Sequence, residues 1–159
     1  MQNAQDAELY LSEEVCALNK YRLKYRKTDD ARFISHLDFV RTITRTFRRA
    51  NLPVKYSQGF NPHMIMTVAL PISVGVISDA EYMEIEFTED VPCGEIVSRL
   101  NENIPLGLII TDARKVSETD TPLNKIAYAK YLVNVEHRGN CDTEKIMQSE
   151  TLEVDKKTK

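Results

Sequence analysis

The chain has 159 residues, of which 42% are apolar and 28% charged, with five glycines, six prolines and no tryptophan. This composition predicts a globular protein with a hydrophobic core, and it excludes a collagen-like or fully disordered chain. The longest apolar stretch, residues 68–76, is interrupted by Pro71, Ser73 and Gly75 and therefore predicts no membrane span.

The net charge of −3 is distributed unevenly along the chain. Residues 20–55 contain eleven basic and three acidic residues, whereas the remainder contains ten basic and twenty-one acidic residues. A basic block in an acidic chain indicates a polyanionic partner, although basic residues that only keep helices and strands soluble would give the same count. The position of the block on helices and strands is therefore informative.

The start of the chain and its cysteines predict a cytoplasmic protein. No basic segment precedes an apolar one at the N-terminus, so we expect no secretory signal. Cys16, Cys93 and Cys141 are scattered and odd in number, which favours free thiols over a disulfide framework.

The first third of the chain predicts a tail, a strand and a helix. Residues 1–19 are polar and acidic and predict an N-terminal tail, whereas residues 21–26 alternate as a half-buried strand does. Ser35 then predicts a helix N-cap, with Asp38 at the positive end of the helix dipole. The helix continues to about Ala50, and its predicted buried stripe consists of Leu37, Val40, Ile43, Thr44 and Phe47.

The following residues complete a β-α-β-β-α-β order over residues 21–116, which predicts an α+β, ferredoxin-like antiparallel sheet with two helices on one face. The remaining elements of this order are a strand at 64–70, a strand at 82–87, a helix opened by Asp90 and Pro92, and a strand at 108–116. In the usual strand order of fourth, first, third and second, the first and third strands are neighbours. We therefore expect a charge ladder of Arg22, Lys24 and Arg26 against Glu84 and Glu86.

The sequence predicts four parts along the chain: the tail 1–19, a ferredoxin-like domain at 20–117, a polar linker at 118–127, and a partial second module with a basic tail at 128–159. The second module begins with a strand over 128–136 and stops as an incomplete β-α-β unit. A lone β-α-β fragment cannot bury both faces of its sheet. We therefore expect residues 128–136 to pack against the first domain or to extend its sheet.

Four arginines stand out on the first predicted helix. Arg41, Arg45 and Arg48 follow i, i+4, i+7 spacing and lie on one face, with Arg49 at its edge. A solvated helix face would have this pattern, but it usually includes alternating acidic residues, which are lacking here. The face is thus a candidate phosphate-contact surface.

The loop after this helix is the most informative segment, because Gly59 permits a positive φ and Pro62 favours an extended residue before it. An aromatic side chain among amides and cations provides stacking, base-edge contacts and phosphate contacts, as single-stranded RNA recognition requires. Filling of the core by Phe60 and closure of a turn by Asn61 would explain the same residues structurally. The candidate RNA- or anion-binding residues of the loop are Lys55, Tyr56, Gln58, Phe60, Asn61 and His63.

His63 and His36 are the candidate catalytic residues, as general acid or base, although either could simply form local hydrogen bonds. The sequence contains no P-loop, no G-x-G-x-x-G, no H-E-x-x-H and no nucleophile elbow. It also lacks C-x-x-x-C-x-x-C, the iron–sulfur motif of radical S-adenosylmethionine (radical SAM) enzymes. We expect the chain itself to bind no cofactor and no metal.

Five segments together resemble a bacterial radical SAM-associated domain of unknown function, which is fused behind radical SAM enzymes or encoded beside them. The resemblance covers residues 20–136 and implies a radical SAM protein as partner, but no active site. A looser similarity links the layout to the tandem ferredoxin-like RNA-processing proteins of CRISPR systems, whose glycine-rich loop has no counterpart here. The five segments are 21–25, 33–38, 45–50, 56–63 and 81–83.

Three hypotheses follow. The first is a non-catalytic accessory module that presents RNA (tRNA or rRNA), or another anionic substrate, to a radical SAM enzyme through the basic helix and loop. The second is a protein-interaction adaptor that docks on the enzyme with the same arginines. The third is a metal-independent endoribonuclease that uses His63 or His36.

Overall fold

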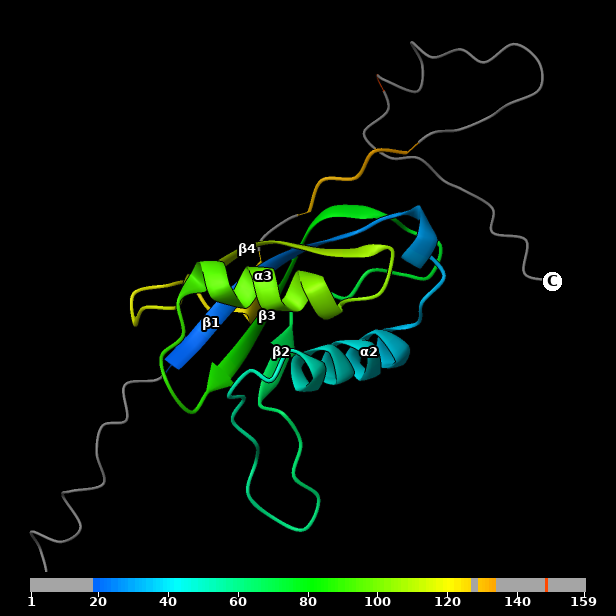
Figure 1. The fold of residues 1–159 in the computed structure, drawn as a ribbon. Helices are drawn as coiled ribbons and strands as arrows, with labels where there is room; N and C mark the ends of the chain where they lie inside the picture. The colour runs from blue at the N-terminus through cyan, green and yellow to red at the C-terminus, as the bar shows by residue number, and fades with distance from the viewer. Residues whose placement is uncertain (1–18, 127–128, 134–147, 149–159) are drawn as a thin grey trace, which may run out of the picture. The chain divides into compact units, whose positions relative to one another are not determined.

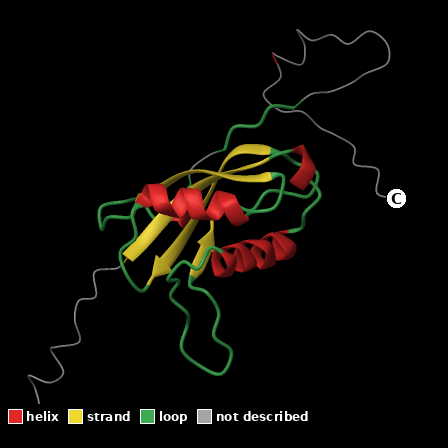
Figure 2. Ribbon diagram, in the orientation of Figure 1, coloured by secondary structure: helices red, strands yellow, loops and turns green. Residues whose placement is uncertain are grey.

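The computed structural model describes residues 19–126, 129–133 and 148 of the chain, and its folded part is a four-stranded antiparallel sheet with two α-helices (Figures 1 and 2). The strand order is β2-β3-β1-β4, which confirms the predicted ferredoxin-like arrangement. The elements are β1 (Asn19–Lys27), the 3-10 turn η1 (Asp29–Ala31), α2 (His36–Arg49), β2 (Met66–Val68), β3 (Ser78–Phe87), α3 (Cys93–Asn103), β4 (Leu108–Lys115) and the 3-10 turn η2 (Leu123–Lys125).

The hydrophobic core lies between the sheet and the two helices, which cover the same face of the sheet (Figure 1). Alternate residues of the central strands point into this core, among them Leu23 of β1 and Met83 of β3, both fully buried. From α3, Ile96 and Leu100 are buried, and Val97 packs at the edge of the core. Phe47 of α2 contacts the ring of Phe87 edge-on, with centroids 6.2 Å apart.

The capping of α2 is as predicted, but its buried stripe is different. Ser35 is the N-cap, and its Oγ accepts a hydrogen bond from the Asp38 backbone N–H at 3.2 Å. The prediction that Leu37 is buried is wrong, since its side chain is 66% exposed. At 3.6 residues per turn, Leu37 lies about 120° around the helix from Ile43. The buried residues are Phe39, Ile43, Thr46 and Phe47.

β2 is shorter than the predicted strand over 64–70. Only Met66–Val68 pairs with β3, and Met64 instead forms an isolated bridge with Tyr56. At the other end, Leu70 has a φ of 26° and precedes Pro71, so the chain leaves the sheet there. The edge of the sheet under α2 is therefore short.

The predicted charge ladder forms in part. Arg22 lies opposite Glu84 and pairs with it at 2.5 Å, as expected. Lys24 instead lies opposite Tyr82 of β3 and Asp112 of β4, so its acidic neighbour is on the other adjacent strand. Two other expected partners pair elsewhere: Arg26 with Asp79 at 2.7 Å and Glu86 with Lys55 at 3.4 Å.

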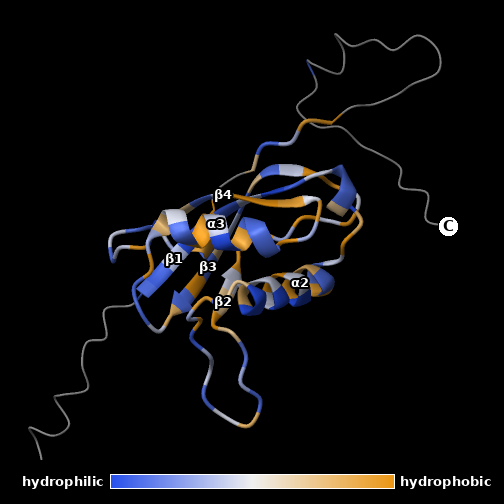
Figure 3. Cartoon of the chain, viewed as in Figure 1, coloured by the Kyte–Doolittle hydropathy of each residue, from blue (hydrophilic) through white to orange (hydrophobic). Residues whose placement is uncertain are grey.

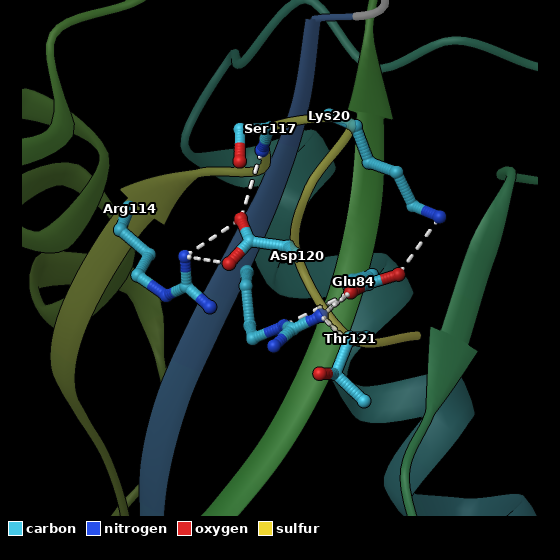
Figure 4. A network of polar contacts seen from close by, with 7 residues as sticks. Lys20, Glu84, Arg114, Ser117, Asp120 and Thr121 are labelled. Carbon is cyan, nitrogen blue, oxygen red and sulfur yellow. Dashed lines mark hydrogen bonds and ion pairs between the residues drawn. The ribbon is translucent and has the colours of Figure 1, made fainter. Parts of the chain in front are cut away.

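The predicted linker is folded over the helix-free face of the sheet, a feature that we call the strap (residues 117–125; Figure 4). The carboxylate of Asp120 accepts hydrogen bonds from the Arg114 guanidinium at 2.8 and 2.9 Å and from the Ser117 N–H at 2.8 Å. These bonds close the turn of residues 117–120 and join it to β4. Arg22 donates to the Thr121 carbonyl at 2.7 Å, and Leu123 is buried. The strap thus belongs to the folded domain.

The described part of the predicted second module is residues 129–133 and residue 148. Residues 129–133 form no strand, and Leu132 and Val133 are exposed. The remainder of the predicted strand over 128–136 and residues 1–18 of the predicted tail 1–19 lie outside the described residues, whereas Asn19 begins β1. The partial second module therefore stays a prediction.

Candidate functional site

α2 presents two rows of side chains outside its buried stripe, one exposed and one partly buried, and i, i+4 spacing generates both. The outer row is Arg41, Arg45 and Arg49, and all three are exposed. Hydrophilic and hydrophobic stretches alternate along the ribbon of α2 (Figure 3). The second row runs between the outer row and the buried stripe, and it consists of His36, Val40, Thr44 and Arg48.

The three arginines of the outer row differ in their ion pairs and hydrogen bonds. Arg41 pairs with Asp38 at 3.2 Å, and both side chains are more than half exposed. Together with the Ser35 hydroxyl, which donates to Asp38 Oδ2 at 2.8 Å, Arg41 keeps the pKa of Asp38 below its ordinary value. Arg49 donates to the Asn103 carbonyl at 2.7 Å, which fixes it against the end of α3. Arg45 has no ion pair or hydrogen bond within the described part of the chain.

The loop between α2 and β2 is closed at its base and exposed at its tip. The Ser57 N–H donates to the His63 carbonyl at 2.8 Å, and the His63 N–H donates to Ser57 Oγ at 3.1 Å. Gly59 adopts a φ of 125° at the turn, as expected for a glycine there. Phe60 is fully exposed, so the alternative that it fills the core is wrong.

A pocket of about 340 Å³ lies between α2, the loop and β2. Its polar side chains are those of His36, Thr44, Arg48 and His63. Its apolar side chains are Val40, Pro62, Met64, Met66 and Val68. The fold therefore brings together the two candidate histidines, which are 27 positions apart in the sequence, and one of the four candidate arginines.

Hydrogen bonds to neighbouring loop residues orient two of the polar side chains in this pocket, those of His63 and Arg48. Nδ1 of His63 lies 2.8 Å from Ser57 Oγ, so the other ring nitrogen, Nε2, is left for a ligand. Arg48 donates from Nε to the Tyr56 hydroxyl at 3.4 Å, which leaves the two terminal nitrogens of its guanidinium. A cation beside two imidazoles can bind a phosphate, and the imidazoles can transfer protons.

The other candidate residues lie around the pocket without lining it. Gln58 and Asn61 are exposed on the loop, as is Phe60. Lys55 is partly neutralised by its ion pair with Glu86. The sequence did not predict the apolar wall, although the i+4 series that starts at His36 was a signal for the side of it that α2 supplies.

Two absences hold for the described residues. Residues 19–126, 129–133 and 148 contain no group of three His, Cys, Asp or Glu arranged to bind a metal ion. Within the same ranges, every helix is too short or too polar to cross a bilayer. Cys93, at the start of α3, is a free thiol.

Residues 20–159 match the profile of a protein family described as uncharacterized proteins conserved in bacteria, DUF2344. The chain belongs to this family. The match begins at the second residue of β1 and covers the rest of the folded domain, including the pocket and the strap. No curated protein matches the sequence. Because the DUF2344 description names no ligand or partner, the site's function has to be inferred from its residues.

Proposed function

We propose that this DUF2344 protein is a non-catalytic accessory module that binds RNA, or another anionic substrate, through the arginines of α2 and the adjoining loop. The observation that supports this best is the set of exposed arginines on α2 together with a fully exposed aromatic residue, Phe60, on the loop that follows the helix. We further propose that the module presents its ligand to a radical SAM enzyme, which rests on the resemblance of the sequence alone.

The charges of α2 favour phosphate contacts over a purely solvated face. Of its four arginines, only Arg41 pairs with an acidic side chain in the described residues. Phosphate oxygens bind guanidinium groups strongly, and the release of counterions makes such binding depend on salt. The helix-free face, which related sheet folds use for RNA, is covered here at its central strands by the strap.

Charge reversal at Arg45 is the first test. We expect Arg45→Glu to lower the affinity for tRNA or rRNA fragments about tenfold at low salt and to reduce the salt dependence, because one phosphate contact becomes a repulsion. Fluorescence anisotropy at two salt concentrations measures both effects. Lys125→Glu is the matched control, since Lys125 is exposed on the strap at the opposite face. Equal affinities for wild type and Arg45→Glu would refute RNA binding by this face.

The adaptor hypothesis involves the same arginines and is separated by a second measurement. A complex with a radical SAM enzyme that survives nuclease treatment, and that Arg45→Glu disrupts while RNA affinity is unchanged, would favour protein docking. Loss of the complex on nuclease treatment would favour an RNA-bridged association.

One observation favours a second candidate function, a metal-independent endoribonuclease: His36, His63 and Arg48 line one pocket. Two imidazoles can act as general base and general acid on an RNA 2′-hydroxyl and leaving oxygen, with a cation stabilising the phosphorane. This function predicts RNA cleavage in EDTA that His63→Asn reduces by at least a hundredfold. Affinity for RNA should stay within about twofold, because the asparagine amide keeps a hydrogen-bond donor and an acceptor at this position. Absence of cleavage by the wild-type chain would exclude this function.

A further inference from the structure

The walls of the pocket divide into a polar and an apolar side. Arg48 and the two histidines provide the donors, whereas Val40, Met66 and Val68 form a half-buried apolar surface. A surface that bound only the phosphates of a duplex would need the polar side of the pocket but not the apolar side. The pocket volume of about 340 Å³ lies at the lower end of the range for small-ligand sites, about 300–1,000 Å³. One nucleotide is a ligand of this size, with an apolar base face and an anionic phosphate.

We propose that the pocket takes one unpaired nucleotide of the bound RNA, with its base against the methionine and valine side chains and its phosphate toward Arg48. This inference rests on the proposed function and specifies its ligand as single-stranded RNA. In an A-form duplex the bases are stacked inside the helix and the side chains of a shallow pocket cannot reach them. An unpaired base can leave the stack and enter.

The polar groups of the pocket are positioned before any ligand arrives. Thr44 Oγ1 donates to the Val40 carbonyl at 2.8 Å, so its methyl group is left for the pocket. Ser57 fixes the ring of His63 through Nδ1, and Tyr56 holds Nε of Arg48. Two neighbouring loop residues, Tyr56 and Ser57, thereby restrain Arg48 and His63, which reduces the entropy lost on binding.

Phe60 extends the same recognition outside the pocket. Its ring is fully exposed near the turn at Gly59, on a loop whose base is closed by the Ser57–His63 pair. Exposed aromatic rings bind bases by stacking, and this contact is tolerant of sequence. The arrangement therefore predicts a preference for unpaired strands rather than for one base sequence.

Filling the pocket tests the inference. We expect the wild-type protein to bind a single-stranded RNA at least tenfold more tightly than a hairpin duplex of equal length and charge, since base contacts add to phosphate contacts. Thr44→Phe fills the pocket from α2 and should abolish this preference while leaving duplex affinity unchanged. Thr42→Phe is the matched control, because Thr42 is on the same helix but does not line the pocket.

A second measurement does not depend on the binding of long RNA. Titration with uridine monophosphate, followed by NMR, should shift the methyl signals of Met66 and Val68 in the wild type and in Arg45→Glu, but not in Thr44→Phe. Equal affinity for strand and duplex, or no shift of these methyl groups, would overturn the nucleotide pocket. If Arg45→Glu still weakens duplex binding in that case, the proposed RNA-binding function survives; if it does not, the function fails independently of the pocket.

Discussion

Replacement of Gly107 by alanine is expected to lower the free energy of unfolding by about 3 kcal/mol, through backbone strain and overpacking together. Gly107 has a φ of 92°, which alanine adopts only with strain. A Cβ atom at this position would lie 2.6 Å from the backbone nitrogen of Ala31. Because Gly107 also accepts a hydrogen bond from the Thr28 N–H at 2.9 Å, the chain cannot move aside without losing it.

Gly75 provides the matched control for this effect. Its φ is 91°, but an added Cβ meets no atom within 4 Å. Gly75→Ala should therefore cost only the backbone strain, about 1 kcal/mol. Chemical denaturation of both variants measures the difference. Equal losses would show that the close approach of Gly107 to Ala31 contributes nothing.

Glu84→Gln is expected to lower the free energy of unfolding by about 3 kcal/mol at pH 7, since breaking one side of a buried ion pair leaves the partner unpaired. The Glu84 side chain is 5% exposed and accepts from Lys20 at 2.8 Å and from Arg22 at 2.5 Å. Glu86→Gln on the same strand is the control, because Lys55, which pairs with Glu86, is half exposed and lies 3.4 Å away. We expect that control to lose less than about 1 kcal/mol.

The same network predicts how stability depends on pH. Burial raises the pKa of Glu84, but the hydrogen bonds and charges of Lys20 and Arg22 lower it by a larger amount. The pKa of Glu84 in the folded state therefore lies below the ordinary value of 4.5. A lowered pKa stabilises the fold above pH 4.5, and this contribution is lost as the pH falls through the pKa of the folded state. The gap in stability between wild type and Glu84→Gln should therefore close on acidification. A gap that stays constant down to pH 2 would contradict this role.

The sheet could be predicted from the sequence because its signals are local. Alternation in β1 and β3, the Ser35 cap of α2 and the Arg22–Glu84 pair all follow from side-chain period and standard topology. The error at Leu37 came from assigning this residue to the buried stripe, although it lies about 120° around the helix from Ile43. Phe39, four residues before Ile43, lies on the buried side and stacks on Tyr25, with 4.9 Å between ring centroids.

The candidate site was predictable as a list of residues but not as a shape. The spacing of the arginines predicted an exposed face of Arg41, Arg45 and Arg48, of which Arg48 lines the pocket, and composition identified the loop. The pocket depends on a contact between α2 and a strand reached some twenty residues later, so no local pattern encodes it. The strap was missed for a similar reason. Its residues are polar, as in a linker, and the side chains that bind it lie on strands: Arg22 of β1, 99 positions before Thr121, and Arg114 of β4.

The strap also changes the position at which this DUF2344 protein could be truncated without disturbing its fold. Composition suggests a cut near residue 117, where the polar stretch begins. Such a cut would remove Leu123 and the Asp120 carboxylate, and it would open the Glu84–Arg22 pair to water. A fragment that keeps this fold intact therefore has to extend to residue 126. The strap is part of the folded domain and not a spacer between modules.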